Sequence, residues 1–182
     1  MLTTEDQERL LKLARHALEA HVRGQAAPAR EGGGVLDEPL GAFVSIHNED
    51  ELRGCLGRLD VDAPLAETVA DLAAVVSDSD PRFQPVSPAE LPSLDVEISV
   101  LTPEREIASI DEIEIGRHGL IIERGYRRGL LLPQVATEHG WDVETFLVQT
   151  CLKAGLPEDA WRSGSRIWIF EAQVFSERSS AA

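Results

Sequence analysis

The sequence predicts an α+β protein in which a mainly antiparallel sheet is accompanied by about three main helices. Three observations predict this class: a few stretches repeat their apolar residues at helical spacing, strand patterns occur in pairs around short polar turns, and the strand patterns outnumber the helix patterns. A chain of 182 residues is close to the length of one domain, so we expect a single domain over 1–182.

Three stretches have helical periodicity. We expect these helices over residues 4–22, 64–76 and 143–154. Thr4 and Gln7 are spaced as a capping box for the first helix, Pro64 suits the first position of the second, and Asp142 caps the third. Residues 23–34 are rich in Gly and Ala and poor in large apolar groups, which favours a mobile loop.

Strand patterns fill most of the remaining chain. We expect strands over residues 40–47, 51–57, 94–101 and 166–175, with two short strands inside 119–133 around a turn at 125–129. Asn48 to Asp50 form the polar tip of a hairpin between the first two strands. Residues 77–93 contain four prolines and are expected to form an extended loop with one capped turn at Ser87 to Glu90.

Composition excludes several classes of function. Asp and Glu total 32 against 17 Lys and Arg, a formal charge of -15, which repels nucleic acid and anionic membrane surfaces. The charged N-terminal stretch has the pattern of neither a signal peptide nor a transmembrane span. We therefore expect a cytoplasmic protein whose two cysteines are separate free thiols.

Cys55 lies in the second predicted strand, next to an arginine on the same face. The two-residue strand period places Arg53 with Cys55 on one face and Leu52 with Leu56 on the other, which we expect to be the core face. A neighbouring guanidinium favours the thiolate, which is the nucleophilic form of cysteine. Cys151, in contrast, lies on the apolar stripe of the third helix, where we expect it to pack as a small hydrophobe.

Two glycines surround this thiol. Gly54 and Gly57 leave room for another backbone or a ligand to approach the strand closely. A ligand site built on Cys55 is one interpretation of the pattern. The other is that Cys55 fills a tight β-bulge against a second layer.

The segment "LRGCLG" (52–57) is similar to the hexapeptide hallmark of the AMMECR family, whose fifth residue is usually isoleucine instead of Leu56. The resemblance continues in the order of the family through "DPRF" (80–83), "EISVL" (97–101), "GRHGLII" (116–122), "LLLPQVATEHGWDVETFL" (130–147), "CLKAGLPEDAW" (151–161) and the last strand. It covers nearly the whole chain, and only the loop 23–34 has no counterpart.

This resemblance has implications for fold and partners. It implies an α+β fold with a larger and a smaller lobe flanking a cleft that the hexapeptide lines. Bacterial and archaeal members are called AmmeMemoRadiSam system protein A, which implies a Memo-like protein and a radical SAM enzyme as partners. The Memo-type protein itself resembles metal-dependent ring-opening dioxygenases. The resemblance implies no particular reaction, substrate or cofactor.

Within these motifs, a few polar residues are candidates for the site. His118 could be a general base for the thiol or a hydrogen-bond partner of a ligand. Glu97 could orient His118 or Arg53, or could simply face solvent. Gln134 opens a predicted helix whose amide end favours an anion. For Arg82 we expect hydrogen bonds to carbonyl groups that hold the proline-rich loop.

Three classes of function remain open. The first is a thiol-dependent enzyme with Cys55 as nucleophile, His118 as base and Arg53 holding a carboxylate or phosphate. The second is a non-catalytic binding or assembly subunit for the Memo-like and radical SAM partners. The third, metal binding by Cys55, His118 and Glu97, ranks last because no local metal-ligand spacing is present. The histidines to which we assign no chemistry are His16, His21, His47 and His139.

Overall fold

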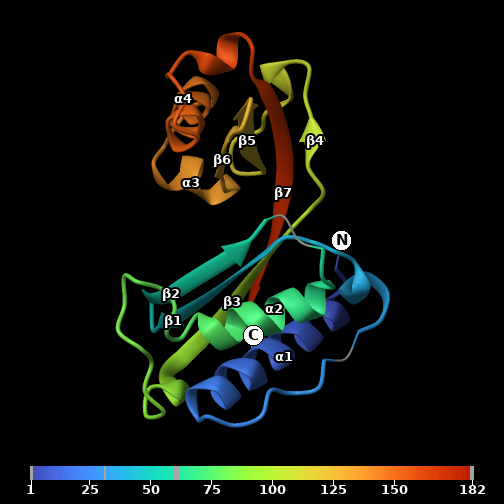
Figure 1. Cartoon of the computed structure of the whole chain (residues 1–182), viewed down its shortest axis with the longest axis vertical. Helices are drawn as coiled ribbons and strands as arrows, with labels where there is room; N and C mark the ends of the chain where they lie inside the picture. Colours follow the sequence, from blue (N-terminus) through green and yellow to red (C-terminus); the bar gives the residue numbers. More distant parts are fainter. Residues whose placement is uncertain (1, 31, 60–61, 181–182) are drawn as a thin grey trace. The chain divides into compact units, whose positions relative to one another are not determined.

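The structure, a computed structural model, describes residues 2–30, 32–59 and 62–180. The chain forms two compact units, each with its own hydrophobic core (Figure 1). Unit 1 is Met1–Leu101 with Gln173–Ala182, and unit 2 is Thr102–Ala172.

The secondary structure confirms the α+β class. Helices in the described part of the chain are α1 (Thr4–Val22), α2 (Leu65–Val75), α3 (Pro133–Glu138), α4 (Val143–Lys153) and α5 (Glu177–Ser180), with single 3₁₀ turns η1 (Gly34–Asp37), η2 (Leu91–Ser93), η3 (Ile110–Glu112) and η4 (Ala160–Arg162). Strands there are β1 (Ala42–Asn48), β2 (Glu51–Arg58), β3 (Leu94–Leu101), β4 (Arg105–Glu106), β5 (His118–Arg124), β6 (Arg127–Leu131) and β7 (Arg166–Ser176). The strand order is β2-β1-β3-β7-β5-β6, with β4 paired to β7. The pairs β1–β2, β1–β3, β4–β7, β5–β6 and β5–β7 are antiparallel.

Helix α1 has the predicted range, but its N-terminal cap is one residue earlier than predicted. The Thr3 hydroxyl accepts the backbone N–H of Asp6 at 3.2 Å, and the Asp6 carboxylate accepts the Thr3 N–H at 3.0 Å. A carboxylate satisfies the free amides at the positive end of a helix better than a neutral amide does. The Thr4–Gln7 box was therefore the wrong prediction.

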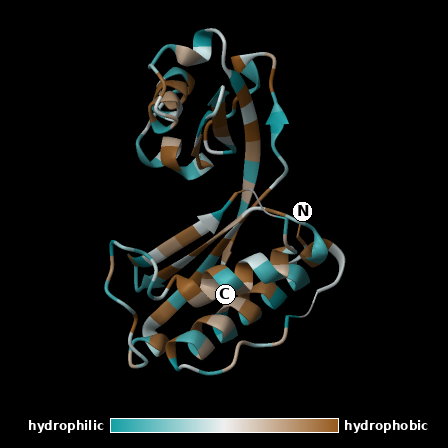
Figure 2. Ribbon diagram, in the orientation of Figure 1, coloured by the Kyte–Doolittle hydropathy of each residue, from teal (hydrophilic) through white to brown (hydrophobic). Residues whose placement is uncertain are grey.

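The core of unit 1 lies between the two long helices and one face of the sheet. Ala42, Val44 and Ile46 alternate along β1 and are fully buried in the same cluster as the apolar stripes of α1 and α2. Figure 2 shows stretches of hydrophobic residues in brown along the helices and strands of unit 1. Because side chains alternate along a strand, Ser45 and His47 lie on the opposite face of the sheet from the helices.

A β-bulge interrupts the hairpin of β1 and β2. Ile46 pairs with Gly54, but the next residue, His47, pairs with Leu52, so Arg53 is the extra residue of β2. The bulge reverses the alternation on its far side, and Leu52 is 39% exposed. The prediction that Leu52 lies in the core was therefore wrong, whereas Leu56 packs against the core as predicted.

Unit 2 is built around the hairpin of β5 and β6. Helix α4 packs on both strands, and its buried side chains Phe146, Leu147 and Cys151 belong to the second core. The predicted packing role of Cys151 is confirmed, and burial raises the pKa of this thiol. The turn of the hairpin is shorter than predicted because β6 already begins at Arg127.

One of the two predicted loops, 77–93, is described over its whole length, whereas the other, 23–34, is not. In the loop 77–93, the Ser87 N–H donates to Glu90 Oε1 at 2.8 Å, which confirms the capped turn. The loop 23–34 includes residue 31, which lies outside the described residues, and its mobility stays a prediction. None of the described helices combines the length and the apolar character that crossing a membrane requires.

Candidate functional site

Cys55 lies in the middle of β2 on the sheet face turned away from the helices. Its cross-strand partner is Ser45 on β1, whose partner on β3 is Glu97. The three side chains therefore form one row across three neighbouring strands. With His47, two residues further along β1, they make up what we call the cysteine face. The Cys55 thiol is half-buried and free.

The two glycines of the hexapeptide are required by neighbouring atoms of unit 1. A Cβ on Gly54 would lie 2.8 Å from the Val76 carbonyl oxygen, at the C-terminal end of α2. A Cβ on Gly57 would lie 2.2 Å from the ring of Phe43. Gly54 thus allows α2 to approach the strand closely, and Gly57 makes room for an aromatic ring on the other face.

Asp80, the first residue of "DPRF", holds the backbone at the cysteine. Its Oδ2 accepts the N–H of Cys55 at 2.9 Å, and its side chain is only 3% exposed. The same carboxylate accepts the Arg82 backbone N–H and two guanidinium N–H groups, at 2.7 and 3.0 Å from the acceptor oxygens. The Arg82 guanidinium and these amides hold the pKa of Asp80 well below its usual range.

Arg82 shares the Oδ2 oxygen of Asp80 with the backbone N–H of Cys55. Its pKa is raised, chiefly by the hydrogen bond to Asp80 and further by Coulomb attraction to Cys55. The side chain is 57% exposed, and among the described residues Nη1 has no hydrogen-bond partner. The prediction that Arg82 binds loop carbonyls was wrong, because the buried Asp80 carboxylate is a stronger acceptor close by.

Arg53 makes the hydrogen bonds to loop carbonyl groups that the sequence predicted for Arg82. Its Nε donates to Glu90 at 3.0 Å, and Nη1 donates to the carbonyl oxygen of Gln84 at 2.8 Å. The Pro85 carbonyl lies 3.4 Å from Nη2, and only 18% of the side chain is exposed. Arg53 therefore fastens the proline-rich loop to β2, and most of its donors are already used.

Sequence reasoning assigned no chemistry to His47, which the structure places on the cysteine face. Its Nε2 is buried and has no hydrogen-bond partner among the described residues. A buried ring nitrogen without a partner is uncommon and suits a proton acceptor or a ligand contact. The signal was present in the sequence, because His47 and Ser45 are two residues apart in a predicted strand.

His118 and Gln134 belong to unit 2, whereas Cys55 and Glu97 belong to unit 1. His118 is buried, and its Nδ1 accepts the backbone N–H of Glu114 at 3.1 Å. In the neutral ring the proton is therefore on Nε2, which lies 4.0 Å from a carboxylate oxygen of Glu171.

Gln134 is half-buried at the start of α3. This helix has only six residues, which is short for the anion site expected at its amide end. The described residues also contain no group of three or more His, Cys, Asp or Glu side chains arranged to hold a metal ion.

Comparisons with known proteins identify the family. The family model AMMECR1 matches residues 11–175. A protein of Methanothermobacter thermautotrophicus is 43% identical over 97% of this chain and 96% of its own length. This chain belongs to the AMMECR1 family.

Other members of the AMMECR1 family agree over similar lengths. Protein MJ0810 of Methanocaldococcus jannaschii is 42% identical, covering 97% of this chain and 92% of the relative. The crystal structure of the uncharacterized protein PH0010 from Pyrococcus horikoshii is similar in fold, with a TM-score of 0.82 and 40% identity. That likeness covers 93% of this chain and 90% of the other, so the AMMECR1 fold includes both units.

Proposed function

We propose that this chain is the AMMECR component of an AmmeMemoRadiSam system, and that its cysteine face binds a small anionic ligand and carries thiol-dependent chemistry. Membership of the AMMECR1 family supports the first part. The resemblance of the sequence associates bacterial and archaeal members with a Memo-like protein and a radical SAM enzyme, which would be the functional partners.

One observation carries the second part of the proposal. The backbone of Cys55 is fixed by the buried Asp80 carboxylate, whose Oδ2 also accepts a hydrogen bond from Nη2 of Arg82, while Cys55 itself remains half-exposed. A packing cysteine needs neither a buried anchor for its amide nor a guanidinium near its sulfur. A fixed thiol beside an accessible cation is suited to a ligand that carries a negative charge close to an electrophilic carbon.

The reaction type that fits is addition of the thiol to such a carbon. The Sγ–C bond forms, the electron pair of the attacked double bond moves to its far atom, and the thiol proton passes to a base. His47 and Glu97 are on the same face as Cys55 and are the acceptors that unit 1 offers. The sequence suggested His118 as this base; in the neutral ring its Nδ1 accepts a backbone N–H and its Nε2 carries the proton, so we propose His47 or Glu97 for the role.

Alkylation by iodoacetamide at neutral pH, mapped by mass spectrometry, tests whether Cys55 is chemically active. We expect Cys55 to be labelled rapidly and Cys151 to remain unlabelled in the native protein, because Cys151 is fully buried. The Arg82→Gln variant should label several-fold more slowly at Cys55, since it removes the charge near the sulfur. Arg58→Gln, which removes a 50% exposed arginine at the end of the same strand, is the matched control and should leave the rate unchanged.

The opposite outcome favours the other class of function. If both cysteines label slowly and neither arginine variant changes the rate, Cys55 is a structural residue. The protein would then be a non-catalytic binding or assembly subunit.

Association with the partners needs its own measurement. Purified chain, Memo-like protein and radical SAM enzyme from one genome should elute together on size exclusion when mixed. If no pair elutes together and activity of the mixture is independent of this chain, membership of the system is refuted, while the labelling result stands separately.

A further inference from the structure

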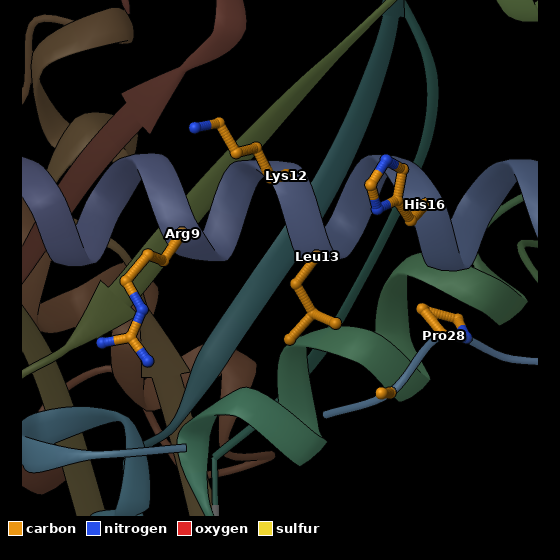
Figure 3. Close-up of a pocket in the computed structure, with 6 residues that line it drawn as sticks. Arg9, Lys12, Leu13, His16 and Pro28 are labelled. Atoms are coloured by element: carbon orange, nitrogen blue, oxygen red, sulfur yellow. The ribbon is translucent and has the colours of Figure 1, made fainter. Parts of the chain in front are cut away.

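A pocket lies on the helical side of unit 1, away from the cysteine face. It has a volume of about 250 Å³ (Figure 3). Its lining residues are Arg9, Lys12, Leu13 and His16 of α1 with Pro28 and Ala29 of the following loop. No carboxylate is among the described residues that line it, although the chain has 32 acidic residues against 17 Lys and Arg.

The basic groups of this pocket lack the partners that other cations of the same helix have. Arg15 pairs with Glu177, and Arg23 pairs with Glu19 at 3.8 Å. Lys12 and His16 are exposed and have no hydrogen bond or ion pair with any residue that the structure describes. In a protein of charge -15, such cations form a local positive site.

Arg9 contributes both charge and structure. Its Nη2 donates to the Gly32 carbonyl oxygen at 2.7 Å, which fastens the loop to α1. Asp6 is close enough for its pKa to be lowered by Arg9 as a minor cause, behind its hydrogen bonds with Thr3. The other guanidinium donors of Arg9 have no hydrogen-bond partner among the described residues.

The loop that lines the pocket opposite α1 is also attached to α2. Arg30 forms ion pairs with Glu67 at 3.0 Å and Asp71 at 2.7 Å, both on α2. Pro28 and Ala29 therefore directly precede two anchored points of the loop, Arg30 and Gly32. Together with Leu13 they give the pocket an apolar surface among the cations.

The positions of the charged side chains restrict the chemical class of ligand that could bind here. Residues 9, 12 and 16 follow one stripe of α1. Figure 3 shows Arg9 and Lys12 leaving the helix on opposite sides in that view, so their charged ends lie apart. A ligand that meets them has more than one negative group, and one that uses Leu13 and Pro28 has an apolar part.

We propose that this pocket binds a small organic diphosphate, with its phosphate groups at Arg9, Lys12 and His16 and its apolar body on Leu13, Pro28 and Ala29. Charge-assisted hydrogen bonds from lysine and arginine are the usual contacts to phosphate oxygens. The site is independent of the proposed thiol chemistry, because it lies on the helical side of the sheet.

The chain offers an internal control for the test, since Lys12 and Lys153 are its only lysines. Lys153 is exposed at the end of α4 in unit 2. Native protein is acetylated with an N-hydroxysuccinimide ester in the presence and absence of ADP, and both sites are quantified by mass spectrometry. We expect ADP to slow acetylation of Lys12 and to leave Lys153 unchanged. Equal rates at Lys12 with and without ADP would refute the site.

Calorimetric titration separates the charged and apolar contributions. ADP is expected to bind more tightly than inorganic pyrophosphate, which has the same charged group but no apolar body. Lys12→Gln should weaken ADP about tenfold, the effect of losing one charge-assisted hydrogen bond, whereas Lys153→Gln should bind like the native protein. Pyrophosphate binding as tightly as ADP would refute the apolar contact, and equal weakening by both variants would mean nonspecific charge attraction and refute the pocket.

Discussion

Replacing Asp80 by alanine tests how the hexapeptide strand is held. The substitution leaves the N–H of Cys55 without its acceptor and removes every carboxylate contact of Arg82. A hydrogen bond from a buried amide to a charged acceptor contributes about 1.5–3 kcal/mol. The ion pair with the exposed Arg82 adds at most about 1 kcal/mol. We therefore expect Asp80→Ala to lower the free energy of unfolding by about 2–4 kcal/mol.

The assay must follow unit 1. All three tryptophans, Trp141, Trp161 and Trp168, are in unit 2, so their fluorescence reports that unit. Urea unfolding followed by far-UV circular dichroism gives the free energy, and hydrogen exchange of the Cys55 amide reports the local bond.

Asp78→Ala is the matched control, because that carboxylate is 42% exposed and pairs with the exposed His21. Loss of this ion pair should lower the free energy of unfolding by less than about 1 kcal/mol. If Asp80→Ala is no less stable than Asp78→Ala and the Cys55 amide exchanges at the native rate, Asp80 does not anchor the strand.

Three further predictions concern stability. Because the pKa of Asp80 is lowered in the folded protein, its contribution is present above the unfolded value of about 3.9 and is lost as pH falls further. The stability difference between native protein and Asp80→Ala should thus be constant from about pH 7 to 5 and shrink only below about pH 4; a difference that already shrinks near pH 6 would contradict this. Gly54→Ala places a Cβ 2.8 Å from the Val76 carbonyl oxygen and should cost about 1–3 kcal/mol in urea unfolding, and a neutral result would mean that α2 moves away freely. Asp142→Ala removes the cap that accepts the Thr145 N–H at 2.8 Å, so thermal unfolding followed by tryptophan fluorescence should show a loss of about 1 kcal/mol, with an unchanged transition as the refuting outcome.

Local periodicity was sufficient to predict most of the elements. The apolar spacing of α1, the alternation of β3 and the cap of α4 depend on neighbours within a few residues, and each was predicted close to its observed range. The short β4 was missed, because a strand of two residues carries no periodicity of its own. Its pairing with β7 is decided by the rest of unit 2.

The sequence was also sufficient to tell the candidate site cysteine from the packing cysteine. Cys55 was separated from Cys151 by the glycines around the first and the apolar helix around the second, and both environments are properties of short segments. The resemblance carried by the motifs led to the AMMECR1 family, which the comparisons establish.

Only the tertiary structure decided which charged groups surround that thiol. The bulge at Arg53 depends on how β2 pairs with β1, and pairing between strands cannot be read from either strand alone. Asp80 and Arg82 reach Cys55 across 25 and 27 residues of chain because α2 and the proline-rich loop fold back along the strand. The sequence determined which residues are candidates for the chemistry. Their partners were decided by long-range packing, since a hydrogen bond forms with the nearest strong acceptor in space.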